Sequence, residues 1–197
     1  IRYARQVTGR PKILVHDHSY HGTVDEAYAT LDEQGNVVAR RGNIGKPVPL
    51  AETTAVVQFN DIPALEASLA TGDIAAVLIE PALTNIGIVL PDPGYHEAVR
   101  ELCTRYGTLL IIDETHTFSA GPGGMIATLD LHPDAVVLGK SIGGGIPAGA
   151  YGMTREFALA VRESLDMEDI DVGGVGGTLA GNAVSLAGIR ATLSQVL

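Results

Sequence analysis

Charged residues stand where several short apolar runs of the sequence end. They are Asp17, Glu80, Asp113 with the adjoining Glu114, and Lys140. If the runs are parallel strands, their carboxyl ends meet at one edge of a sheet, and ligands bind in the crevice outside that edge. A carboxylate and an amine that end neighbouring strands would then reach the same small ligand. Each residue taken alone is also compatible with an ordinary solvated strand end.

Two nucleotide-binding motifs match the glycine-rich parts of the sequence poorly. Residues 139–141, Gly-Lys-Ser, look like the end of a P-loop, but Asp134 stands where this motif needs its first glycine, and a glycine run follows the lysine instead of preceding it. Neither 143–145 nor 173–177 supplies G-x-G-x-x-G after a strand, with an acidic residue about 20 positions later. The sequence therefore argues against an NTPase and against a dinucleotide site.

Three neighbouring histidines raise the question of a metal site. On an extended segment His16 and His18 point the same way, whereas His21 lies beyond them in a loop. No cysteine or carboxylate completes a diagnostic ligand spacing. We therefore expect no metal at this cluster.

The apolar runs predict the elements that would position these residues. They are rich in Val, Ile and Leu and do not alternate with polar residues, which is typical of strands covered on both faces of a mostly parallel α/β sheet. The runs cover residues 12–17, 56–59, 75–80, 109–113, 136–139 and 148–153. Helix start and stop signals separate them, at 60–63 with Gly72, at 93–94 with Gly107, and at Thr154.

Other segments carry local signals of their own. Between residues 95 and 106 the apolar side chains fall on one helical stripe that includes Cys103, which we expect in the core. The chain opens like the last turns of a helix closed by Gly9 and ends in a helix-like stretch, 184–197, so we expect both ends to be cut from a larger domain. The polar stretch 23–54 predicts a lid or active-site loop, with a hairpin around 34–36 as the alternative.

Composition limits the class of protein. With 197 residues, one cysteine and a formal net charge of −10, the chain fits one globular domain and lacks the clustered Lys and Arg of a nucleic-acid-binding protein. The longest apolar run, 74–79, is far shorter than the roughly 18 residues of a membrane-spanning helix. We expect a soluble, cytoplasmic protein with neither nucleic acid nor a membrane as partner.

Short motifs in a fixed order give the sequence a family resemblance. They are Tyr-His-Gly at 20–22, Glu-Pro at 80–81 with Asn85, Asp-Glu at 113–114, Lys140 before a glycine run, and Gly-Thr at 177–178 followed by Gly181 and Asn182. Together they resemble class III pyridoxal-phosphate (PLP) aminotransferases, and within them the branch around glutamate-1-semialdehyde aminomutase. The resemblance covers the whole chain. It implies the central part of the PLP-binding large domain of a fold-type I enzyme, truncated at both ends, with 148–153 as an antiparallel strand.

The resemblance also implies roles for single residues at the cofactor. Lys140 would be the catalytic residue, which forms the Schiff base with PLP and moves the α proton. Asp113 would face the pyridinium nitrogen and keep it protonated. Tyr20 would stack on one face of the ring and Thr115 would occupy the opposite face. Asn85 would hydrogen-bond the phenolic oxygen of the ring.

Three more residues belong to the implied site. His21 would contribute to cofactor binding beside the stacking tyrosine, and Glu80 would support the site indirectly. Thr178 would reach the cofactor phosphate of the neighbouring subunit, so the resemblance implies a homodimer with shared active sites. The segment 115–118 departs from the family pattern and offers no arginine for a substrate carboxylate.

The function implied is PLP-dependent transfer of an amino group from a small amino acid or amine to an oxo acid or aldehyde. One alternative is the intramolecular reaction of a glutamate-1-semialdehyde 2,1-aminomutase, which Asn85 favours. Another is a catalytically silent, truncated domain that serves in dimerisation or binding.

Overall fold

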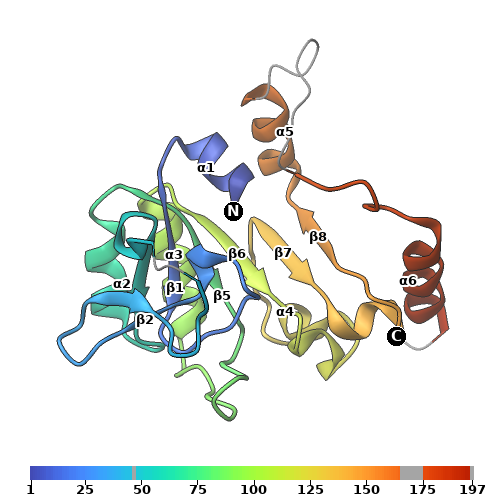
Figure 1. Ribbon diagram of the computed structural model, residues 1–197, viewed down its shortest axis with the longest axis horizontal. Coiled ribbons are helices and arrows are strands. Elements are labelled where there is room, and N and C mark those ends of the chain that lie inside the picture. The colour runs from blue at the N-terminus through green and yellow to red at the C-terminus, as the bar shows by residue number, and fades with distance from the viewer. Residues whose placement is uncertain (46–47, 165–174, 196–197) are drawn as a thin grey trace.

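A six-stranded sheet forms the centre of the protein, with the strand order β4-β1-β5-β6-β7-β8 (Figure 1). The computed structural model describes residues 1–45, 48–164 and 175–195. The strands are β1 Lys12–His16, β4 Thr54–Val57, β5 Ile74–Ile79, β6 Leu109–Asp113, β7 Ala135–Leu138 and β8 Ala150–Met153. Neighbours pair in parallel, except that β8 is antiparallel to β7. The predicted mostly parallel α/β sheet and its antiparallel strand are confirmed.

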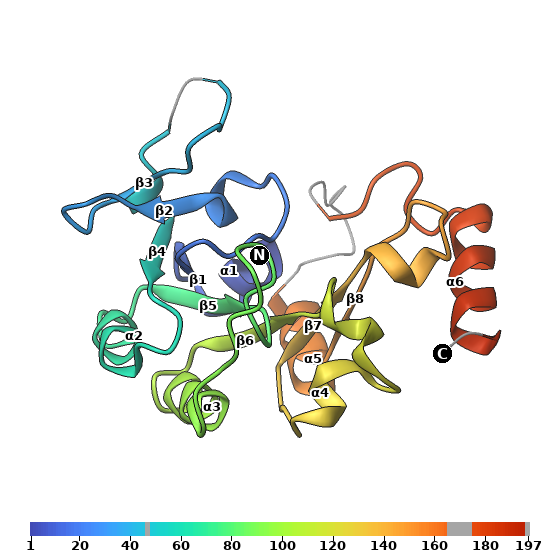
Figure 2. The same ribbon diagram turned by 90° about the horizontal axis from the view of Figure 1, so that it is seen from below.

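The central strands β1, β5 and β6 are mostly apolar and almost wholly buried, because both faces of the sheet are covered there. Along β6, Leu110 and Ile112 join a buried cluster with α2 (Ile62–Leu69) and α3 (Tyr95–Arg105), which lie along one face (Figure 2). Ile111, between them, joins the opposite cluster, to which α1 and α5 contribute. These two helices span Arg2–Thr8 and Arg155–Ser164. Cys103 is fully buried in the α3 cluster, as predicted.

The strand register brings the predicted charged residues to one side of the sheet. In the β6–β7 pair, Asp113 stands opposite Val137, three residues before Lys140. In the β5–β6 pair, the residue before Glu80 stands opposite the residue before Asp113. We call this side, where β1, β5, β6 and β7 end, the carboxyl edge.

A β-hairpin occupies part of the segment 23–54, so the hairpin alternative is confirmed. β2 (Ala29–Leu31) pairs antiparallel with β3 (Val37–Ala39). Movement of the whole segment over a ligand stays a prediction, which slower amide hydrogen exchange upon ligand binding would support.

The hairpin is fastened to the carboxyl edge by a buried carboxylate. Asp17, which follows β1, accepts hydrogen bonds from Thr30 Oγ1 at 2.5 Å and from the backbone N–H of Leu31 at 3.2 Å. Its other oxygen accepts from Gln58 Nε2 at 2.8 Å. Burial acts to raise the pKa of Asp17, but these hydrogen bonds outweigh burial and lower it. The carboxylate therefore holds the ends of β1 and β4 and the hairpin together.

Helices lie near both ends of the chain. α1 closes on Gly9, which has the left-handed φ of 66°, as the sequence predicts. α6 (Ala183–Gln195) corresponds to the predicted last helix, although residues 196–197 lie outside the described residues, as do 173–174 of the glycine-rich segment. None of the described helices is long and apolar enough to cross a membrane.

Glu114, which directly follows β6, fastens the short helix α4 (Gly124–Thr128). Its carboxylate accepts from the backbone N–H of Ile126 at 2.7 Å and of Met125 at 3.0 Å. Gly124 has a φ of 66°, and a Cβ added there would lie 2.6 Å from Glu114 Oε1. Only glycine satisfies both the backbone conformation and this close approach.

Replacing Gly124 with alanine should therefore lower the free energy of unfolding by about 1–3 kcal/mol, because the new methyl group is strained and displaces the Glu114 carboxylate. Gly121→Ala is the matched control, since Gly121 has an extended φ of 166° and no neighbouring atom within 4 Å of an added Cβ. Urea unfolding of the full protein measures both. Equal midpoints for the two variants would contradict the assignment.

Candidate active site

Residues 16–21 leave β1 at the carboxyl edge and bring His21 to Asp113 at the end of β6. His21 Nδ1 lies 2.8 Å from Asp113 Oδ2, and the two side chains are only 2% and 8% exposed. Because a carboxylate only accepts, Nδ1 carries a proton and donates it. Two residues that the sequence separates by more than 90 positions thus form one buried pair.

Asp113 is held in its ionised form. Burial acts to raise its pKa, but the hydrogen bond and the charge of His21, together with hydrogen bonds from Thr115, lower the pKa below the ordinary value for an aspartate. The backbone N–H of Thr115 donates to Asp113 Oδ1 at 2.9 Å. The side chain is therefore negative at neutral pH.

Tyr20 is positioned through its backbone. The N–H of Tyr20 donates to Glu80 Oε1 at 3.3 Å, and the second oxygen of Glu80 accepts from Thr84 Oγ1 at 2.6 Å. Glu80 is only 3% exposed. Its carboxylate thus ties residues 16–21 to the loop after β5, which is the geometry expected of a supporting residue.

Lys140 follows β7 and lies exposed at the carboxyl edge. Its φ of 47° falls in the left-handed region, which is uncommon for residues other than glycine, and strained residues of this kind cluster at active sites. The preceding Gly139 allows close approach to the next strand end, since an added Cβ would lie 3.2 Å from Thr115 Cγ2. Lys140 and Thr115 therefore leave adjacent strands beside Asp113.

Two residues of the predicted site lie apart from this cluster. Asn85 is exposed in the loop after β5, where it forms an isolated bridge with Gly87. Thr178 is exposed in the turn that precedes α6. Within the described ranges, no hydrogen bond joins either residue to Asp113 or Lys140. Their roles at a cofactor stay predictions.

Sequence reasoning did not single out a buried pair behind the carboxyl edge. The Tyr95 hydroxyl lies 2.6 Å from His16 Nε2, and His16 is fully buried. Burial, followed by the charge of His21, lowers the pKa of His16 to about 3, so this imidazole is neutral. The only signal in the sequence was a histidine at the end of an apolar strand.

Several polar atoms of residues 16–21 are buried without a hydrogen-bond partner. They are His16 Nδ1, Ser19 Oγ and His21 Nε2. Buried polar atoms are nearly always hydrogen-bonded in native proteins, so a polar ligand or water at this point would satisfy them. In the part of the chain that the structure describes, no group of three or more His, Cys, Asp or Glu side chains is placed to hold a metal ion.

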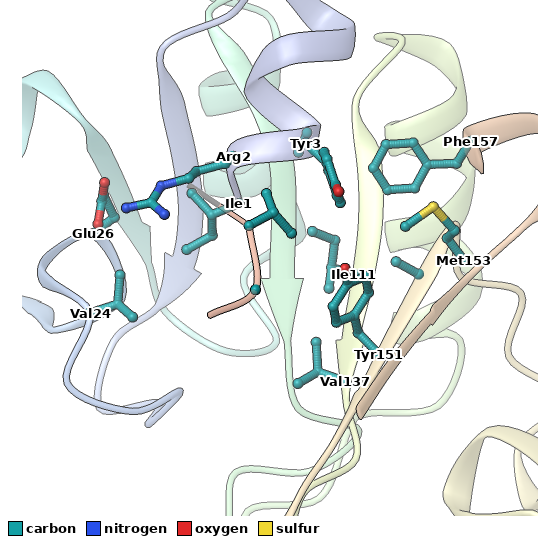
Figure 3. Close-up of a pocket in the computed structure, with 14 residues that line it drawn as sticks. Ile1, Arg2, Tyr3, Val24, Glu26, Ile111, Val137, Tyr151, Met153 and Phe157 are labelled. Atoms are coloured by element: carbon teal, nitrogen blue, oxygen red, sulfur yellow. The ribbon is translucent and has the colours of Figure 1, made fainter. Parts of the chain in front are cut away.

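A cavity of about 460 Å³ lies elsewhere, against the sheet face that α1 covers. Tyr3, Ile111, Tyr151 and Phe157 are among the side chains around it (Figure 3). None of the site residues expected from the sequence is among its lining residues in the described ranges. We therefore place the candidate site at the carboxyl edge and not in this cavity.

The sheet topology defines the class of protein, since it is that of the central part of a fold-type I large domain. The model of the family "Aminotransferase class-III" matches residues 1–197, and the chain belongs to this family.

The relatives described here are named for two different enzyme activities, an aminomutase and a transaminase. The chain is 41% identical over 192 residues to the glutamate-1-semialdehyde 2,1-aminomutase of Opitutus terrae, a match that covers 95% of this chain and 43% of that protein. A crystal structure of a glutamate-1-semialdehyde aminomutase from Pseudomonas aeruginosa PAO1 has a TM-score of 0.94 at 46% identity, over 99% of this chain and 44% of that one. A variant of the latter enzyme was crystallised in complex with PMP.

An omega-transaminase from Sphaerobacter thermophilus is similar at 32% identity, with a TM-score of 0.81 over 98% of this chain and 46% of that one. The chain thus spans less than half the length of these relatives.

Replacing Asp113 with asparagine should lower the free energy of unfolding by about 1–3 kcal/mol at neutral pH, because His21 loses a charged acceptor. Since the pKa of Asp113 is lowered in the folded protein, its contribution is complete above the pKa of an unfolded aspartate and is lost as the pH falls through the folded pKa. The gap between the urea midpoints of wild type and Asp113→Asn should therefore narrow in acid. A gap that stays constant from about pH 7 to about pH 3 would contradict this role.

Proposed function

We propose that the full protein containing this chain is a PLP-dependent aminotransferase, which moves an amino group between an amino acid or amine and an oxo acid or aldehyde. The observation that carries this proposal is the buried, ionised Asp113, held by His21 one strand away from Lys140. PLP, when bound, supplies an aldehyde that reacts with amines and a ring that withdraws electrons from the substrate.

The residues of the carboxyl edge fit such a ring. A negative Asp113 would keep a proton on the ring nitrogen, because an ion pair about 4 Å apart contributes about 4 kcal/mol at an effective dielectric constant of about 20. The unpartnered atoms of Ser19 and His21 lie buried in the adjoining segment, where a polar ligand would satisfy them. The PMP complex of a relative with 46% identity supports the same cofactor.

The remaining residues would act around the ring. The amine of Lys140 would hold the cofactor and, once displaced by the substrate amine, would take up and return the α proton. Tyr20 and Thr115 would bound the two faces of the ring. Asn85 would donate a hydrogen bond to the phenolic oxygen, and Glu80 would keep Tyr20 in place.

A second candidate is the intramolecular reaction of glutamate-1-semialdehyde 2,1-aminomutase. Asn85 favours it, as do the names of the relatives at 41% and 46% identity. Both candidates differ from a catalytically silent domain, because each requires bound PLP. We also propose the cytoplasm as the location and small molecules as the substrates.

The two reactions can be distinguished because only the aminotransferase reaction needs an added amino-group acceptor. An aminotransferase should convert an amino acid continuously only when pyruvate or 2-oxoglutarate is added, because the donor half-reaction leaves the amino group on the cofactor and an oxo acid must then take it up. An aminomutase should convert glutamate-1-semialdehyde without any oxo acid. Product formation under both conditions, measured by chromatography, decides between them. Absence of a PLP absorbance band in the reconstituted full protein would contradict both and leave the silent domain.

We further propose that the protein acts as a homodimer with shared active sites. Thr178 is exposed in a glycine-containing turn, where its hydroxyl and neighbouring N–H groups suit a phosphate of another subunit. The loop after β5 also exposes a run of apolar side chains, with Ile88 at 77% and Leu90 at 64%, as an interface would require.

Mixed dimers test the sharing of sites. Lys140→Ala subunits should be inactive, and Thr178→Ala subunits should bind PLP weakly. A dimer of one of each has one site with an intact Lys140 and an intact Thr178 from its partner, so mixing and reassociation should restore PLP affinity and turnover. Activity equal to the average of the two parents, or an active monomer in sedimentation, would contradict the shared site.

A further inference from the structure

Arg40 reaches the candidate site from the hairpin. It follows β3, and its guanidinium donates from Nη1 to the backbone oxygen of Ser19 at 2.6 Å and from Nη2 to that of His18 at 3.2 Å. These carbonyls belong to the segment that carries Tyr20 and His21. The side chain is thus fixed to the backbone next to the residue expected to stack on the cofactor ring.

Aromatic rings extend this contact to Tyr20. The guanidinium carbon of Arg40 lies 5.6 Å from the centre of the Tyr28 ring. That ring lies 6.2 Å from the ring of Tyr20, nearly perpendicular to it. The ring of Tyr28 therefore lies between the positive charge of Arg40 and the ring of Tyr20 in the candidate site.

No carboxylate neutralises this charge among the described residues. Asp17, the nearest buried carboxylate along the chain, is occupied by Thr30, Leu31 and Gln58. Other arginines do have carboxylate partners, for example Arg100 with Asp134 at 2.9 Å. Of the five N–H groups of a guanidinium, the two contacts to backbone oxygens of residues 18 and 19 leave others for a ligand.

Arg10 provides a useful contrast. It also binds no carboxylate in the described ranges, but it donates to the backbone oxygens of Ile74 and Tyr106 and to Thr108 Oγ1, where β5 and β6 begin. That is the opposite side of the sheet from the carboxyl edge, so Arg10 stabilises the starts of these two strands and lies far from the candidate site. Arg40 donates two side-chain hydrogen bonds where Arg10 donates three, and it lies on the side where a ligand would bind.

We propose that Arg40 binds the carboxylate of the amino donor or acceptor. The inference rests on the proposed function and adds to it that the substrate is a carboxylate-bearing compound and not a simple amine. A planar guanidinium, pre-oriented by two carbonyls and an aromatic ring, suits a carboxylate because it offers parallel N–H donors at little entropic cost. The segment 115–118 supplies no such arginine.

Calorimetric titration of the full protein tests this with a matched pair of unreactive ligands, butyrate and butyramide. In Arg40→Met the dissociation constant of butyrate should rise about 10-fold or more, the loss expected for one charge-assisted interaction, and that of butyramide should not change. Arg41→Met, at the exposed neighbouring residue, is the control and should bind both ligands as the wild type does. Arg40→Lys keeps the charge and should recover part of the butyrate affinity.

Each other result overturns the proposal. Unchanged butyrate binding in a folded Arg40→Met protein would do so. Equal losses of affinity for butyrate and butyramide would do so too, because they would show that Arg40 only stabilises the local structure. A weaker affinity for PLP with unchanged butyrate binding would assign Arg40 to the cofactor phosphate. Wild-type protein that binds butyrate no better than butyramide would also refute it. The same titrations are also carried out on protein from which PLP has been left out. If the protein fails to bind PLP, the proposed function is refuted, but the butyrate titrations still test the role of Arg40.

Discussion

The buried carboxylate of Asp113 constrains the rest of the carboxyl edge. A charge so deep in the sheet needs a partner, and His21 supplies one at 2.8 Å. To bring His21 there, residues 16–21 must cross the ends of β5 and β6. The other contacts of the segment keep it on that path, with Tyr20 held by Glu80 and Asp17 held by the hairpin. Removing either member of such a pair leaves a buried polar group unpaired, so the pair stabilises this arrangement of the edge.

The way in which the carboxylates are satisfied has a chemical consequence. Four buried acidic residues lie at this edge, Asp17, Glu80, Asp113 and Glu114. Within the described residues, they take their hydrogen bonds from hydroxyls, amides and imidazoles and not from lysine or arginine. The cations of the same region therefore keep their charge for a ligand. Among the described residues, Lys140 and Arg40 are two such cations.

The sequence predicted those parts of the fold that depend on local pattern. Continuous apolar runs identified the strands, Gly9 marked a helix end, and the ordered motifs located Asp113 and Lys140. Contacts between distant residues left no such pattern. The fit of Gly124 against Glu114 depends on a turn whose geometry cannot be read from glycine content. Likewise, the hydrogen bond between Tyr95 and His16 joins an α3 side chain to β1, and no pattern of spacing along the sequence predicts this contact.

The proposed chemistry depends on Lys140 as the residue that would hold the cofactor at the carboxyl edge. The most direct measurement is borohydride reduction of the full protein after reconstitution with PLP, followed by proteolysis and peptide mass mapping. We expect the reduced cofactor on the peptide that contains Lys140 and none on the Lys140→Ala protein. Attachment to Lys12 or Lys46, or no attachment at all in a protein that binds PLP, would contradict it.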